Sequence, residues 1–153
     1  MTRRTKVALG IAVLALAVIV VAVLVGFGGS GTKTSTANQK DQVVQTWTTF
    51  FAGSTPASKK VQLLQDGPRF APLIKAQAAS PLAQQTTAVV TKVTLESPTR
   101  AKVVYTIMLA GKPALKNQVG TAVRVGGTWK VGDASFCALL SLQGAMPPVC
   151  RHA

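Results

Sequence analysis

Hydrophobic and polar positions divide the chain into three stretches with different periods. The first, Val7–Phe27, is 21 residues long and contains no charged residue. The second, from Asn38 to about Pro81, repeats its hydrophobic residues at helical spacing. The third, from Thr86 to Val131, alternates hydrophobic and polar residues as strands do. This order predicts an apolar segment, then helices, then a β-sheet.

The first stretch predicts a transmembrane helix, because 21 residues at about 1.5 Å each match the roughly 30 Å hydrocarbon core of a bilayer. The basic head, residues 1–6, carries Arg3, Arg4 and Lys6, and such a flank stays in the cytoplasm. We therefore expect a single-pass membrane protein with its N-terminus inside and its C-terminal domain outside.

Signal cleavage and secretion are the alternative to this membrane anchor. A cleaved signal has an apolar region of about 7–15 residues that ends in a small-x-small site. Here the Ala-x-Ala pattern, Ala15 to Ala17, lies inside the apolar run. This favours a retained anchor. Residues 28–37, rich in Gly, Ser and Thr, predict a flexible linker before an extracytoplasmic domain at residues 38–153.

Three helices are expected at the start of that domain. The first ends at Gly53, the second has Thr55 as its cap and Gly67 as its end, and the third carries Pro72 as a candidate break. Their spacing predicts that one face of each helix is buried. The residues on these faces are Val43, Val44, Trp47, Phe50, Phe51, Val61, Leu63, Leu64, Phe70, Leu73 and Ile74.

Four strands are expected next. Residues 86–97 alternate, with Val89, Thr91, Val93 and Leu95 predicted on one face, and residues 100–111 alternate after a tight turn. Residues 111–117 are expected to be a loop. Two further strands flank Gly126-Gly127, a strong hairpin signal.

A short helix at residues 135–143, capped by Ser135 or Asp133, is expected to follow the strands. Helices grouped before an antiparallel meander predict an α+β fold with the helices packed on one face of a four-stranded sheet. The other face carries Lys92, Thr94, Lys102 and Thr106, and we expect it to meet solvent.

The two cysteines, Cys137 and Cys150, stand 13 residues apart near the end of the chain. Outside the cytoplasm two thiols usually oxidise together, so a disulfide is expected, with free thiols as the alternative. A metal site would need two more ligands, and His152 is the single histidine. No metal or cofactor is predicted.

The residue pattern resembles the C-terminal domain of the low-molecular-weight secreted antigen family of mycobacteria and related actinobacteria. The resemblance covers roughly Asp41 to Gln143, and its most specific parts are "STPA…K…LLQDG" and "GGTWKV…ASFCALL". It implies a cone-like domain similar to nuclear transport factor 2, with a curved sheet around helices. It also implies an exported or cell-envelope location and no established enzymatic activity.

Candidates for catalysis are few. The four acidic residues, Asp41, Asp66, Glu96 and Asp133, occupy positions that suit caps or turns. No nucleophile motif or Gly-rich phosphate loop occurs. Catalytic residues are therefore not predicted, and the protein is expected not to be an enzyme.

Charge and aromatic residues suggest two kinds of binding. The chain has 17 Lys and Arg against 4 Asp and Glu, which favours contact with an envelope protein, anionic lipid or an acidic wall polymer. Binding to nucleic acid is disfavoured by the predicted compartment. We therefore expect a membrane-tethered, non-enzymatic interaction domain. The alternative is a carrier or weak enzyme with an apolar cavity, in which Tyr105 and Trp129 would line the mouth rather than pack in the core like the other aromatic residues.

Overall fold

The computed structural model describes residues 35–144 and 146–152. The predicted basic head, the anchor Val7–Phe27 and most of the linker lie outside these residues. Among the described residues, no helix is both long and apolar enough to span a membrane.

The elements, in chain order, are α1 (Thr36–Phe51), α2 (Ala57–Leu63), α3 (Gly67–Ala78), α4 (Pro81–Gln84), β1 (Thr86–Ser97), β2 (Arg100–Leu109), β3 (Lys112–Val125), β4 (Thr128–Val131), α5 (Asp133–Leu142) and the 3-10 helix η1 (Pro148–His152).

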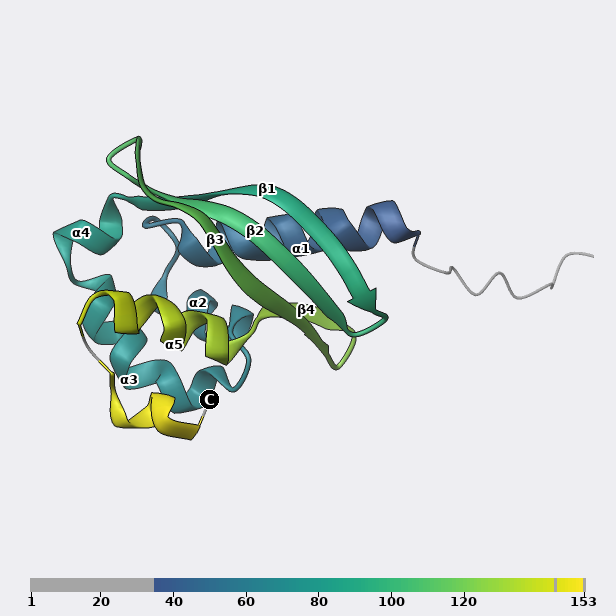
Figure 1. Cartoon of the computed structure of the whole chain (residues 1–153). Coiled ribbons are helices and arrows are strands. Elements are labelled where there is room, and N and C mark those ends of the chain that lie inside the picture. The colour runs from purple at the N-terminus through teal and green to yellow at the C-terminus, as the bar shows by residue number, and fades with distance from the viewer. Residues whose placement is uncertain (1–34, 145, 153) are drawn as a thin grey trace, which may run out of the picture. The chain divides into compact units, whose positions relative to one another are not determined.

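The four strands form an antiparallel meander in the order β1-β2-β3-β4. Figure 1 shows α1 running along the sheet, while α2, α3, α4 and α5 gather at the end opposite the β1–β2 turn. The predicted α+β class and the four-stranded antiparallel sheet are therefore confirmed. The likeness to nuclear transport factor 2 stays a prediction.

A β-bulge in β1 corrects the predicted face of that strand. The pairing with β2 shifts between Val90 and Lys92, so that Thr91 is an extra residue. Its hydroxyl donates to the carbonyl oxygen of Val104 at 3.1 Å. Because a bulge reverses the alternation, Ala88 faces the core and Val89 is 50% exposed. The prediction was wrong for Val89 and Thr91, whereas Val93 and Leu95 pack against the core as expected.

The segment predicted as a loop, residues 111–117, is the first half of β3. Leu109 pairs with Lys112 and Ile107 pairs with Leu115. The pairing is irregular here, and Asn117 adopts a left-handed conformation with φ of 54°. Glycine, proline and asparagine are typical of loops, so their presence in this segment led to the prediction of a loop instead of a paired strand. Strand β3 also packs against α5.

Helix α1 supplies the centre of the core. Its N-cap is Ser35, whose hydroxyl accepts from the backbone N–H of Asn38 at 3.3 Å. Four of the five residues predicted to face inward are buried, and Thr46 is buried in addition to them. The Thr46 hydroxyl donates to the carbonyl oxygen of Trp129 at 3.3 Å, which joins α1 to β4.

Helices α2 and α3 pack against each other, and α2 also contacts α1. Leu64 follows α2, is fully buried and bridges to Val131 of β4. Gly67 begins α3 rather than ending α2, and Asp66 is its N-cap in a left-handed conformation. Pro72 does not break α3, and it lies in the second turn, where it removes one backbone hydrogen bond at most.

Helix α5 closes the core. The caps predicted for it are wrong, since its N-cap is Gly132 and no side chain caps it. Ser135 instead accepts from the backbone N–H of Thr121 at 2.7 Å through its hydroxyl oxygen, and so joins α5 to β3. The predicted disulfide is present between Cys137 of α5 and Cys150 of η1.

Thr34–Ala153 is a compact unit with a complete core of its own. Among residues 35–144 and 146–152, the buried hydrophobic residues lie between Val43 and Cys150, and the disulfide closes within the same segment. The segment therefore contains the described core and its disulfide, and it is expected to fold without residues 1–33.

Candidate cavity between the helices and the sheet

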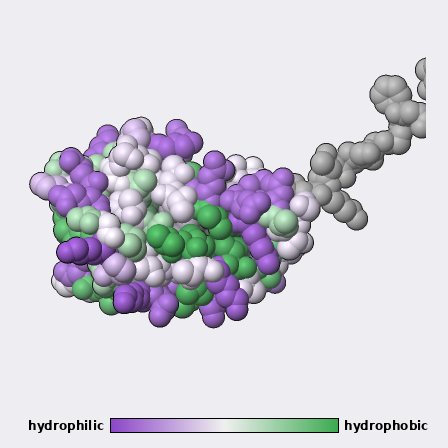
Figure 2. Space-filling view, turned by 90° about the horizontal axis from the view of Figure 1, so that it is seen from above, coloured by the Kyte–Doolittle hydropathy of each residue, from purple (hydrophilic) through white to green (hydrophobic). Residues whose placement is uncertain are grey.

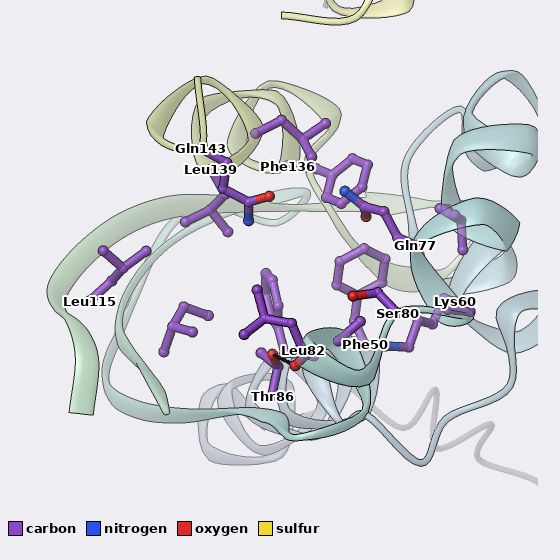
Figure 3. Close-up of a pocket in the computed structure, with 16 residues that line it drawn as sticks. Phe50, Lys60, Gln77, Ser80, Leu82, Thr86, Leu115, Phe136, Leu139 and Gln143 are labelled. Carbon is purple, nitrogen blue, oxygen red and sulfur yellow. Dashed lines mark hydrogen bonds between the residues drawn. The ribbon is translucent and has the colours of Figure 1, made fainter. Parts of the chain in front are cut away.

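One cavity, of about 170 Å³, opens where the helices meet the end of the sheet. Figure 3 shows its lining. Helix α5 contributes Phe136, Leu139, Leu140 and Gln143, which share one helical face at spacing 0, 3, 4 and 7. The other helices and the sheet add Phe50, Phe51, Ile74, Ala78, Leu82, Ala83, Ile107 and Leu115.

Polar groups lie mainly on one side of this cavity. Lys60 of α2, Gln77 of α3 and Ser80 before α4 lie together there, with Phe50 between them (Figure 3). Leu115 and Leu139 lie on the opposite side. The cavity therefore has one side that carries an amine, an amide and a hydroxyl, and an opposite side where Gln143 is the polar neighbour of Leu139 (Figure 3).

The segment after α1 closely approaches the junction between α4 and β1, which includes the cavity-lining residue Thr86. Gly53, just after α1, donates its N–H to the carbonyl oxygen of Thr86 at 2.8 Å. A Cβ on Gly53 would stand 2.0 Å from the carbonyl oxygen of Gln84, so only glycine fits. Thr86 also donates its hydroxyl to the carbonyl oxygen of Leu82 at 2.8 Å. These contacts fix α4 beside the end of α1.

Lys60 is the single cation of the lining. Its side chain is half-buried, and the structure records neither an ion pair nor a side-chain hydrogen bond for it with the described residues. Burial lowers the pKa of its ammonium group below the ordinary value of 10.5. Lys60 was not predicted as a site residue from the sequence. The one feature that could have indicated it is its position directly before Val61, which was predicted to face the core.

Tyr105 and Trp129, for which the sequence allowed either core packing or the mouth of a cavity, lie in the core. Each is 1% exposed and neither lines the cavity. The Tyr105 ring packs against the rings of Trp47 and Phe51 at centroid distances of 5.3 and 5.6 Å, and burial raises its pKa. Helix α1 covers this face of the sheet, since Trp47 packs on Tyr105 and Thr46 donates to the carbonyl oxygen of Trp129.

None of the four carboxylates lines the cavity. Asp41 and Asp66 are exposed, and Glu96 pairs with Arg100 at 3.3 Å on the surface. Asp133 accepts from the N–H of Ala134 at 2.7 Å. Within residues 35–144 and 146–152, no group of three or more histidine, cysteine or acidic side chains is close enough to hold a metal ion.

The outer face of the sheet is a second surface of interest. No described helix covers it, and Lys92, Thr94 and Lys102 are exposed there as predicted. Val89 and Val119 share this face and are 50% and 59% exposed. Figure 2 shows that hydrophobic residues reach the surface in a continuous band bordered by hydrophilic ones on the side that it views.

Comparison with known proteins supports the resemblance found in the sequence. No curated protein matches the chain. The family described as "Low molecular weight antigen MTB12, C-terminal domain" matches residues 36–147. The match spans α1 to α5 and therefore includes every residue that lines the cavity. The chain thus belongs to the family of the low molecular weight antigen MTB12 C-terminal domain.

Proposed function

We propose that this domain binds a small, largely apolar ligand in the cavity between α5 and the sheet, without converting it chemically. The observation that carries the proposal is the cavity itself, whose lining is mainly aromatic and aliphatic. Its volume of about 170 Å³ is similar to that of apolar protein cavities that enclose benzene. Ligand sites are commonly of this kind, concave and apolar with a few convergent polar groups.

The position of the carboxylates supports the non-enzymatic part of this proposal. General acid–base chemistry on a bound ligand needs a titratable group within hydrogen-bond reach. All four acidic side chains lie outside the lining, and Lys60 is the one titratable group within it. The cavity is therefore better suited to holding a molecule than to transforming it.

The family points to an extracellular or cell-envelope location. We propose in addition that Val7–Phe27 anchors the domain to the cytoplasmic membrane, on its outer side. The uncharged run and the basic residues before it support this. Mass spectrometry of the native N-terminus tests the anchor, because a mature protein that begins after Phe27 would show cleavage and release.

Calorimetric titration of Thr34–Ala153 with 1-octanol tests ligand binding. We expect saturable binding with a negative heat-capacity change, which marks the burial of apolar surface. Leu139→Trp, which fills the cavity, should abolish binding. Leu142→Trp is the matched control, since Leu142 is on the same helix and 60% exposed. Equal binding by both variants would place the ligand elsewhere.

A second candidate function is contact with an anionic surface through the outer face of the sheet. The described residues carry 13 Lys and Arg against 4 acidic residues, a difference of 13 − 4 = +9, and they show one ion pair. Binding of the domain to anionic vesicles should weaken steeply with added salt, because salt screens exposed charges. Binding that is unchanged at high salt would contradict this function.

A further inference from the structure

We propose that the ligand of the cavity is a medium-chain carboxylic acid, with its hydrocarbon chain between Leu115 and Leu139 and its carboxylate beside Lys60. This inference rests on the proposed function and specifies the chemical class of the ligand. It follows from the arrangement of one unpaired cation and an apolar interior within a single cavity.

The first step concerns charge. A half-buried ammonium group is unfavourable unless an anion or hydrogen-bond acceptors compensate it. Lys60 has no such partner among the described residues, whereas Glu96, which does not line the cavity, is paired with Arg100. A carboxylate from a ligand would supply the missing charge, and the lowered pKa of Lys60 is consistent with an amine that lacks it in the empty cavity.

The second step concerns the neighbours of Lys60. Gln77 and Ser80 lie on the same side of the cavity (Figure 3). An amide N–H or a hydroxyl can donate to a carboxylate oxygen, so either neighbour is able to add a hydrogen bond to a head group beside Lys60. Lysine supplies a single point charge, which matches one singly charged head group such as a carboxylate.

The third step concerns size. The opposite side of the cavity carries Leu115, Leu139 and the neutral side chain of Gln143, and it offers no charged group. A volume of about 170 Å³ encloses roughly six carbon atoms if it resembles cavities that hold benzene. The cavity is open to solvent at one side, so part of a longer chain can extend beyond the enclosed volume. A chain of about six to ten carbons would therefore fill the cavity with its head group beside Lys60.

The experiment compares octanoate, 1-octanol and octylamine, three probes with the same chain and different head groups. Each is titrated calorimetrically into Thr34–Ala153 and into its Lys60→Met and Lys59→Met variants. Lys59 is the matched control, because it precedes Lys60 in α2, is exposed and does not line the cavity. Met keeps most of the length of the lysine side chain and removes its charge.

We expect the wild-type domain to bind octanoate about tenfold more tightly than 1-octanol, and octylamine least tightly. Lys60→Met should lose the preference for octanoate and keep its affinity for 1-octanol, which also shows that the variant is folded. Lys59→Met should behave as wild type.

Two other results would overturn the inference in different ways. Equal affinities of the wild type for octanoate and 1-octanol, or the same loss in both lysine variants, would refute the carboxylate contact and leave the apolar cavity as a binding site. Absence of binding by all three probes would refute the proposed function itself, and the carboxylate inference with it.

Discussion

Gly120 and Trp47 face each other across the core, so closely that no side chain fits between them. A Cβ on Gly120 would stand 2.7 Å from Cζ2 of the Trp47 ring, which is fully buried. Trp47 belongs to α1 and Gly120 to β3. The missing side chain in β3 is therefore what allows α1 to lie against the sheet.

Gly120→Ala is expected to destabilise the domain by about 1–3 kcal/mol, because the added methyl group overpacks the core. Urea denaturation of the wild type and the variant measures this change. In a Trp47→Phe background the smaller ring should leave room for the methyl group, so the same substitution should cost less. An equal cost in both backgrounds would show that the ring is not the obstacle.

Ser135→Ala is expected to cost about 1–3 kcal/mol, because the backbone N–H of Thr121 would lose its partner in a partly buried position. Ser141→Ala is the matched control on the same helix. Ser141 is exposed and donates to the carbonyl oxygen of Ala138 within α5. Its replacement should change the free energy of unfolding by less than about 0.5 kcal/mol. Similar effects of both changes would argue against a special role for Ser135.

Replacement of Cys137 and Cys150 together by serine is expected to lower the free energy of unfolding by about 3 kcal/mol, the value for a loop of this size. The two residues are 13 positions apart. Thermal denaturation with and without a reducing agent checks this. The wild type should melt at a lower temperature when reduced, whereas the double variant should not respond. A wild-type melting temperature that ignores the reducing agent would contradict the prediction.

Lys60→Met is expected to stabilise the ligand-free domain at pH 7. The folded-state pKa of Lys60 lies below its unfolded value of 10.5, so the unfolded chain binds more protons in the interval between the two values. Stability therefore rises with pH across that interval, and the burial cost is fully present below it. The difference in free energy of unfolding between Lys60→Met and the wild type should therefore become smaller as the pH approaches 10.5.

Denaturant melts of the wild type, Lys60→Met and Lys59→Met at pH 7 and near pH 10 measure this dependence. Tyr105, whose raised pKa lowers stability above pH 10, is present in all three proteins and cancels in the comparison. Lys59→Met should show no pH-dependent advantage. A destabilised Lys60→Met at pH 7 would mean that Lys60 has a favourable partner in the empty domain.

The sequence predicted the elements with strong periods and missed those that depend on local irregularity. Strand β1 matches its predicted range, residues 86–97, because alternation and the turn after it are clear. The bulge at Thr91 could not be predicted from the sequence, because the hydrophobic–polar pattern does not show which residue of a strand is left without a partner in the neighbouring strand. Helices α4 and η1 are too short to give a period, and neither was expected.

The candidate site was the least predictable part. Its lining comes from all five α-helices, the segment before α4 and three strands, so no short stretch of sequence contains it. The fold type suggested a cavity with Tyr105 and Trp129 at its mouth, but how deep a residue lies in the core depends on how the helices pack, which the sequence does not show. The disulfide was predictable because the compartment, rather than the geometry, determines whether two such thiols oxidise.

The bond between Cys137 and Cys150 fastens the tail of the chain to the helix that forms one wall of the cavity. Such bonds persist where conditions are oxidising. Reduction of this bond would free the tail from α5 and leave that wall held by noncovalent packing alone. If the proposed binding function is correct, the affinity of the cavity for octanoate should therefore depend on the redox state of these two cysteines.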